Sequence, residues 1–266
     1  MFLNREFINT YSYLIILVMK LLAIYNLKGG VGKTAATVNL AYLSSAEGKK
    51  TLLIDMDPQG ASSFYLGAKG DVNVDDIKKM IKGNYDIIDN IYETGYENLD
   101  ILPSDSDYRK IELFLNDMKD ASRWLSDFVK PLKKNYDMVI LDCPPNITLL
   151  TENIFRNADY ILVPVVPTVL TVRTYEQILE YFKSYRLNKD KLIPFFSMYE
   201  RRKKMHNEII RSFARKFRET ISVLIPYSAE VEKMGIYRAP LTAKRPSEEA
   251  SKAYVKLWKA LKKKME

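Results

Sequence analysis

A glycine-rich loop between two ordered segments is the feature that most restricts how this chain can fold. Residues 20–27 form a short apolar run, residues 28–34 read KGGVGKT, and residues 34–46 carry a helical pattern that ends near Gly48. A short apolar run of this length is typical of a buried strand, and glycines let the backbone turn tightly. The segment therefore predicts a buried strand, a tight loop and a helix.

The composition of this loop indicates a phosphate-binding site. A phosphate chain needs several converging backbone N–H groups, which a glycine-rich turn before a helix supplies. The Lys33 amine can reach the β- and γ-phosphates of a nucleotide, and the Thr34 hydroxyl can bind Mg²⁺. A chance glycine-rich turn would not also carry this Lys-Thr pair between a strand and a helix. The loop therefore predicts binding of ATP with Mg²⁺.

Short apolar runs alternate with helical patterns along the rest of the chain. We expect further strands at residues 51–56, 99–102, 138–141, 160–166, 191–197 and 222–225, and helices at 109–129 and 248–264. This alternation predicts an α/β fold, a doubly wound, mostly parallel sheet with helices on both faces. No repeat or linker divides the sequence, so residues 19–266 are expected to form a single domain. Residues 1–18 are expected to be an N-terminal extension, either disordered or upstream of the natural start.

Acidic residues follow two of the predicted strands, where parallel sheets place their ligand-binding loops. Asp55 and Asp57 lie in the sequence DMDPQG, and Asp142 follows the apolar run 138–141. A buried strand that delivers one aspartate to its carboxyl end is typical of a site that holds Mg²⁺ through a water. Asp142 is therefore expected to bind the metal. Cys143 is expected to be a packed side chain, because no basic partner lies near it in the sequence.

Together these motifs resemble those of a known family. KGGVGKT with a lysine before its glycine pair, then DMDPQG, then the aspartate at the end of an apolar strand are similar to the deviant Walker A P-loop ATPases of the ParA/MinD family. The resemblance runs from about Lys20 to Lys264 and favours the ParA/Soj-like branch. It implies slow ATP hydrolysis, an ATP-dependent homodimer, and a ParB-like or cargo adaptor protein that stimulates hydrolysis. The implied function is a nucleotide switch in DNA partitioning or intracellular positioning.

The resemblance also assigns roles to individual residues. It implies that Lys28 reaches the nucleotide of a partner subunit, that Asp57 orients the attacking water, and that Asp55 supports the Mg²⁺ shell. The catalytic residues would be Lys28, Lys33 and Asp57, and the metal-binding residues Thr34, Asp55 and Asp142. The nucleotide-binding residues would be Lys28, Gly29, Gly30, Val31, Gly32, Lys33, Thr34 and Ala35, with Pro226 and Tyr227 beside the adenine. Ala35 departs from the family pattern, in which a threonine is common.

Two segments compete as the surface on which such dimers gather. Basic residues are dense between residues 201 and 218, where Glu208 is the one acidic residue, and this density suits a phosphate backbone. We expect sequence-independent binding of double-stranded DNA by Arg201, Arg202, Lys203, Arg211, Arg215 and Arg218. The alternative is a MinD-like membrane helix at 248–264, which has Tyr254, Leu257, Trp258 and Leu261 on one face. The same pattern is typical of a helix that packs on the sheet, which we favour over membrane binding.

Charge and cysteine content fit this interpretation. The net charge is +8 and the pI is about 9.2, which suits a polyanionic partner, although a lysine-rich surface alone would have the same effect. One cysteine excludes an intramolecular disulfide and a cysteine metal cluster, and it fits a cytoplasmic protein, here associated with the nucleoid. A nucleotide-binding regulatory module without significant hydrolysis is a further alternative. The presence of Lys33, Thr34, Asp57 and Asp142 disfavours it.

Overall fold

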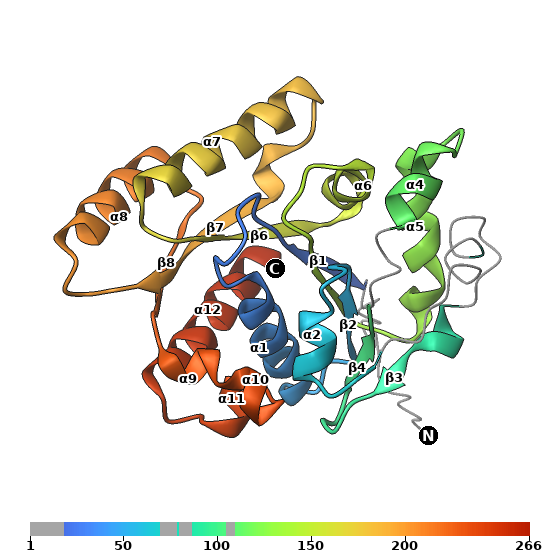
Figure 1. The fold of residues 1–266 in the computed structure, drawn as a ribbon, viewed down its shortest axis with the longest axis horizontal. Coiled ribbons are helices and arrows are strands. Elements are labelled where there is room, and N and C mark those ends of the chain that lie inside the picture. The colour runs from blue at the N-terminus through green and yellow to red at the C-terminus, as the bar shows by residue number, and fades with distance from the viewer. Residues whose placement is uncertain (1–18, 70–78, 80–86, 105–109) are drawn as a thin grey trace, which may run out of the picture.

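The computed structural model describes residues 19–69, 79, 87–104 and 110–266, so the expected extension at residues 1–18 lies outside the described residues. The described residues form an eight-stranded sheet in the order β3-β4-β2-β5-β1-β6-β7-β8 (Figure 1). The strands are β1 (Lys20–Ile24), β2 (Thr51–Asp55), β3 (Tyr92–Glu93), β4 (Leu99–Leu102), β5 (Met138–Asp142), β6 (Tyr160–Val165), β7 (Leu192–Tyr199) and β8 (Ile221–Pro226).

The strands pair in parallel except for β3, which runs antiparallel to β4 at one edge. The central strands β2 and β5 are buried along their whole length, because helices cover both faces of the sheet. Every strand predicted from the sequence is present, and the mostly parallel, doubly wound α/β fold is confirmed. β3 was not predicted, since two residues are too few to show an alternating pattern.

Helices cover the sheet in two layers (Figure 1). One layer consists of α4 (Lys110–Asn116), α5 (Trp124–Val129), α6 (Leu149–Asn157), α7 (Val169–Ser184) and α8 (Lys204–Lys216). The other consists of α1 (Lys33–Ala46), α2 (Ala61–Tyr65), α9 (Ala229–Glu232), α10 (Met234–Tyr237), α11 (Leu241–Lys244) and α12 (Glu249–Met265). Short 3-10 turns are η1 (Ile88–Asn90), η3 (Ala121–Arg123), η4 (Lys130–Lys134) and η5 (Lys189–Lys191).

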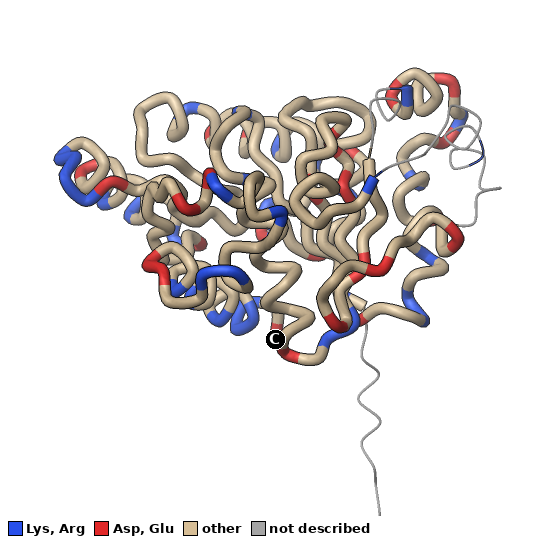
Figure 2. The backbone as a smooth tube through the Cα atoms, turned by 60° about the horizontal axis from the view of Figure 1, so that its bottom comes forward, with Lys and Arg blue, Asp and Glu red and all other residues tan. Residues whose placement is uncertain are grey.

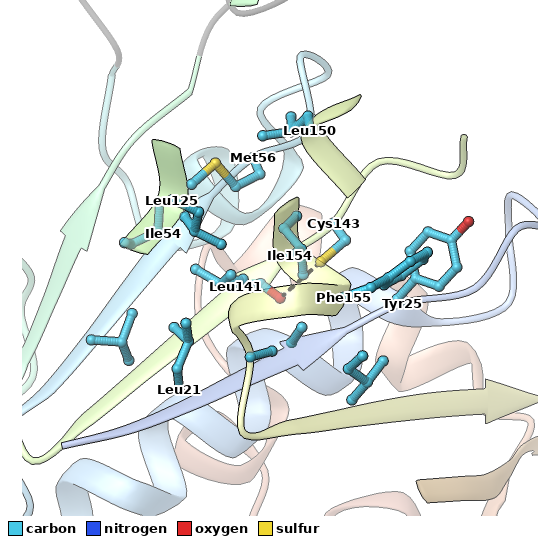
Figure 3. Packing of buried hydrophobic residues seen from close by; sticks show 14 of the residues in the cluster. Leu21, Tyr25, Ile54, Met56, Leu125, Leu141, Cys143, Leu150, Ile154 and Phe155 are labelled. Atoms are coloured by element: carbon cyan, nitrogen blue, oxygen red, sulfur yellow. Dashed lines mark hydrogen bonds between the residues drawn. The ribbon is translucent and has the colours of Figure 1, made fainter. Parts of the chain in front are cut away.

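The core beneath α6 packs against the carboxyl ends of the central strands (Figure 3). The ring of Tyr25, just after β1, meets the Phe155 ring edge to face with 4.7 Å between centroids. Cys143 is fully buried in the same layer, and its Sγ lies 3.7 Å from the Leu141 carbonyl oxygen. Burial raises the pKa of the Cys143 thiol, so the thiolate is disfavoured. The interpretation of Cys143 as a packed side chain is confirmed.

The single helix predicted over residues 109–129 is wrong. α4 ends at Asn116, and the N–H groups of Asp117 and Met118 each bond a carbonyl three residues back, which closes the last turn. The chain restarts as η3 and then α5. Short polar side chains compete with the helical backbone for hydrogen bonds, and here Asp120 accepts one from the Ser122 hydroxyl at 2.9 Å. The apolar pattern continues across this interruption, so it could not reveal the break.

α12 packs its apolar face on the protein itself. Tyr254, Leu257, Trp258 and Leu261 are buried, and the helix contacts α1 and β8. The interpretation of this segment as an ordinary packed helix is confirmed, because the stripe that would enter a membrane is part of the core. Among the described residues, no helix is both long enough and apolar enough to span a bilayer.

Replacing Leu257 by alanine tests this packing. Leu257 is 0% exposed, so Leu257→Ala should lower the free energy of unfolding by about 2–5 kcal/mol through lost burial and a residual cavity. Urea denaturation followed by circular dichroism measures the change. Lys256→Ala, on the exposed side of the same helix, should change it by no more than about 0.5 kcal/mol. Equal stability of the two variants would contradict the buried position of this face.

Candidate nucleotide-binding site

The predicted phosphate loop joins β1 to α1 at the carboxyl edge of the sheet. Gly30 and Gly32 have φ angles of 70° and 90°, a region that residues with a Cβ rarely adopt. A Cβ built on Gly32 would lie 2.8 Å from the Ser197 Oγ, so close contact also requires glycine there. Gly32 is the N-cap of α1, and the N–H groups of the first helical turn lack helical partners. This geometry makes a backbone cradle for an anion.

A buried asparagine holds the loop, and the sequence analysis missed it. Asn26 is 0% exposed, and its amide group donates to the Pro164 carbonyl of β6 at 2.8 Å. Its Oδ1 accepts the Lys28 N–H at 2.9 Å, so one side chain ties the start of the loop to the neighbouring strand. The available signal was a polar residue inside the apolar run 20–27. A buried amide of this kind must find hydrogen-bond partners.

The two loop lysines differ in their surroundings. Lys33 is 7% exposed, and its Nζ lies 3.4 Å from the Lys28 carbonyl oxygen. Burial lowers the pKa of Lys33, whereas the nearby carboxylates of Asp142 and Asp57 oppose that shift. The Lys28 side chain is exposed at the rim of the loop. The structure therefore places Lys33 among the acidic residues and Lys28 on the surface.

Two aspartates end neighbouring parallel strands side by side. Asp55 of β2 and Asp142 of β5 are register partners, and both are 0% exposed. Burial raises the pKa of each carboxyl group, and repulsion from Asp142 adds to the shift of Asp55. Hydrogen bonds from Ser62 and Thr34 act in the opposite direction at Asp142. These two adjacent buried carboxylates thus lack enough positive charge nearby to balance them.

This donor set fits a magnesium ion. Carboxylate and hydroxyl oxygens from Asp55, Asp142 and Thr34 are ligands that Mg²⁺ prefers, and a divalent charge would neutralise the buried pair. No three His, Cys, Asp or Glu side chains converge as a full ligand set in the part of the chain that the structure describes. Mg²⁺ is commonly held by one or two carboxylates together with substrate phosphates, so this sparse set is sufficient.

Two consecutive serines at the start of α2 bind these carboxylates. The Ser62 hydroxyl donates to Asp142 Oδ2 at 2.7 Å. Ser63 donates to Asp55 Oδ2 through its hydroxyl at 2.7 Å and through its N–H at 2.9 Å. The sequence analysis did not single out either residue, because a serine at the start of a helix is commonly only a cap. Asp142 is 80 residues from Ser62, so the fold alone brings these two together, whereas Asp55 is eight residues before Ser63.

Asp57 lies in the turn between β2 and α2. It is half-buried, its Oδ1 accepts the Gln59 N–H at 3.0 Å, and its own N–H donates to Asp55 Oδ1 at 3.2 Å. Its charge acts on both Lys33 and Asp142. The loops after β1, β2 and β5 therefore meet at one edge, as the parallel sheet predicted. The role of Asp57 in hydrolysis stays a prediction.

A pocket of about 40 Å³ opens beside the loop. Gly32 and Ala35 line it from the start of α1, Met198 from β7, and Pro226 and Tyr227 from the end of β8. The structure thus brings both predicted adenine-side residues to the phosphate loop. The volume is close to that of one water molecule, so a base would have to lie partly outside the pocket or displace Tyr227, whose side chain is exposed.

The predicted DNA-contacting residues lie on another surface, around α8. This helix buries His206, Ile209 and Phe213, and it exposes Arg211 and Arg215 on the opposite side. We define the α8 basic surface as the exposed residues Arg201, Arg202, Lys203, Arg211, Arg215 and Arg218. Within the described residues, Lys203 alone among these six forms an ion pair, with Glu200. Figure 2 shows Lys and Arg gathered at the end of the molecule where α8 lies.

Comparison with known proteins gives consistent matches. A family model described as an AAA domain matches residues 19–194. The chain is 30% identical over 246 residues to the sporulation initiation inhibitor protein Soj of Bacillus subtilis. The matched region covers 90% of this chain and 97% of Soj. It is 28% identical to the chromosome partitioning protein ParA of Caulobacter vibrioides, over 90% of this chain and 92% of ParA.

A solved structure agrees in fold. The cell division ATPase MinD of Pyrococcus furiosus superposes with a TM-score of 0.73 at 24% identity and covers 92% of this chain and 98% of MinD. The glycine-rich loop, the paired aspartates and the sheet order are thus accompanied by sequence similarity along most of the chain. The chain belongs to the ParA/MinD family of P-loop ATPases.

Proposed function

We propose that residues 19–266 act as one ATPase domain of the ParA type, a nucleotide switch in DNA partitioning or intracellular positioning. The observation that carries the proposal is the meeting of Lys33, Asp57 and Asp142 at the glycine-rich cradle. The names of the relatives, which include chromosome partitioning proteins, support the biological role. A regulatory module without hydrolysis is the weaker alternative, because it would not need a carboxylate beside the cradle.

The residues divide the work of phosphoryl transfer. The backbone of residues 29–34 and the Lys33 amine bind the phosphates, and Ala35, Pro226 and Tyr227 lie on the side of the adenine. Thr34, Asp55 and Asp142 would hold Mg²⁺, which supplies charge neutralisation for the phosphates when bound. Asp57 orients the attacking water. Such a reaction depends mainly on positioning and electrostatics, so one water-orienting carboxylate is enough for a slow ATPase.

Dimerisation and stimulation of hydrolysis complete the switch. The exposed position of Lys28 at the rim of the loop supports its reach toward the nucleotide of a second copy. ATP would then join two chains, and hydrolysis would release them. A ParB-like or cargo adaptor protein would accelerate this slow step.

The dimer would gather on DNA through the α8 basic surface. Its arginines have no carboxylate partner within the described residues, so they are available to phosphates. A dimer of two copies would place two such surfaces on one DNA duplex. This binding would take place in the cytoplasm, on the nucleoid. A MinD-like membrane role is the second candidate, but the apolar face of α12 would have to leave the core first.

Paired lysine substitutions test nucleotide binding and dimerisation. Lys33→Ala should abolish ATP binding in a calorimetric titration, because the buried amine that faces the phosphates is lost. Lys28→Ala should still bind ATP but remain monomeric in analytical ultracentrifugation. Unchanged affinity in Lys33→Ala would remove the basis of the proposal, and an ATP-dependent dimer of Lys28→Ala would remove the role of Lys28 across the interface.

Asp57→Asn tests hydrolysis separately from binding. The asparagine keeps an acceptor for the Gln59 N–H but loses the charge that orients the water. The rate of ATP hydrolysis should fall about a hundredfold, and the ATP-bound dimer should accumulate in ultracentrifugation. Wild-type turnover by this variant would assign the water to another group.

A double charge reversal tests the α8 basic surface. Arg211→Glu with Arg215→Glu should weaken ATP-dependent binding to unrelated DNA duplexes alike and reduce the salt dependence, by about 0.9 in slope for each lost phosphate contact. Lys256→Glu with Lys259→Glu makes the same charge change on exposed positions of α12 and should have little effect. Fluorescence anisotropy measures both. ATP-dependent sedimentation of the wild type with anionic liposomes but not with DNA would favour the membrane role.

A further inference from the structure

The Ser62–Asp142 hydrogen bond is a side-chain link between the end of β5 and α2, in addition to the backbone bond from the Met56 N–H to the Asp142 carbonyl at 2.9 Å. Asp142 ends β5, whereas Ser62 lies in the first turn of α2, directly after the turn that carries Asp57. Ser62 is 0% exposed, and its hydroxyl donates to Asp142 Oδ2 at 2.7 Å. A hydrogen bond to a buried carboxylate is among the stronger ones in proteins. This bond therefore anchors α2 to the strand that carries the expected metal ligand.

The segment between Asp57 and Ser62 is short and internally bonded. The Gly60 N–H donates to the Asp57 carbonyl at 2.9 Å, and the Phe64 N–H to the Gly60 carbonyl at 2.9 Å. Gly60 has a φ angle of 61°, and a Cβ there would lie 3.1 Å from the Ser104 carbonyl oxygen. The segment between Asp57 and Ser62 therefore has little freedom to move by itself, and a displacement of the start of α2 also displaces Asp57.

A threonine on α1 provides an internal comparison. Thr37 donates to the other oxygen of the same carboxylate, Asp142 Oδ1, at 3.3 Å, and also to the Lys33 carbonyl at 3.0 Å. Thr37 lies in the helix that begins at the phosphate loop and has no short connection to Asp57. Ser62 and Thr37 thus bind one carboxylate from two elements, and of these two side chains Ser62 is the one that lies in α2, next to the Asp57 turn.

We propose that Ser62 is a positioning residue that couples Asp142 to Asp57, so that the occupancy of the metal site sets the place of the water-orienting carboxylate. The coupling rests on the proposed roles of Asp142 and Asp57. A metal ion bound by Asp142 would interact with the same carboxylate that accepts the Ser62 hydrogen bond and so holds α2 in place. The Ser62 side chain therefore links metal binding to the position of the Asp57 turn, beside the backbone bond from Met56 to Asp142.

Amide hydrogen exchange in the nucleotide-free protein tests the anchoring directly. Ser62→Ala should raise the exchange rate of the Asp57, Gln59 and Gly60 amides about tenfold, because one charge-assisted hydrogen bond to α2 is lost. Thr37→Val removes a second hydroxyl that donates to Asp142 and should leave these amides at the wild-type rate. Ser62→Thr keeps the hydroxyl and should return the rate toward that of the wild type. The free energy of unfolding of each variant, measured in urea, shows whether a change in its exchange rate comes from a change in global stability.

Kinetics give the second measurement. Ser62→Ala should lower kcat about tenfold at saturating ATP and Mg²⁺ while the affinity for ATP stays at the wild-type value, because binding depends on the phosphate loop. Unchanged exchange of the Asp57, Gln59 and Gly60 amides in Ser62→Ala, or equal acceleration in Thr37→Val, would overturn the coupling. A wild-type protein that does not hydrolyse ATP would instead refute the proposed function, and the exchange measurement would still decide whether Ser62 anchors the turn.

Discussion

Asp55 and Asp142 lie at the ends of adjacent parallel strands, and neither side chain has exposed surface. Much of the site is arranged to offset the free-energy cost of burying two carboxylates side by side. A buried carboxylate is stable only with hydrogen bonds or opposite charge. The protein supplies both, through Ser62, Ser63 and Lys33. The positions of α2, of the Asp57 turn and of the Lys33 side chain therefore follow from one electrostatic requirement. A bound cation would neutralise the negative charge of the two carboxylates that these groups leave unbalanced.

The parallel sheet explains why these groups meet at all. Strands β2, β5, β1 and β6 are neighbours, so the loops at their carboxyl ends share one edge although they are far apart in the sequence. Asn26 adds precision to this arrangement, because it fixes the beginning of the phosphate loop to β6. The DNA-contacting surface proposed for α8 lies in the other helical layer, so contact with a polyanion need not block the nucleotide cradle.

The strand pattern, the phosphate loop and the acidic strand ends could be predicted from the sequence because each depends on local residue order. Short apolar runs mark buried strands, and glycine with the Lys-Thr pair marks the cradle. The break near Asp120 could not be predicted, since the apolar pattern on both sides of it is helical. Asn26, Ser62 and Ser63 were missed for a different reason. The partners of Asn26 and Ser62 lie on strands that are distant in sequence, and no spacing along the chain reveals which strands are neighbours. Ser63 bonds Asp55 only eight residues away, but a serine in the first turn of a helix is commonly only a cap.

The packing of α12 on α1 also has a consequence for synthesis of the protein. α1 begins at Lys33 and follows the first strand, whereas α12 comes after all eight strands in the sequence. During translation the side of α1 that contacts α12 therefore emerges early from the ribosome and is covered by α12 only after the strands have been made. A nascent chain that lacks α12 exposes this surface to chaperones and to other nascent chains. The late position of α12 in the sequence thus leaves one side of α1 uncovered while the eight strands are being made.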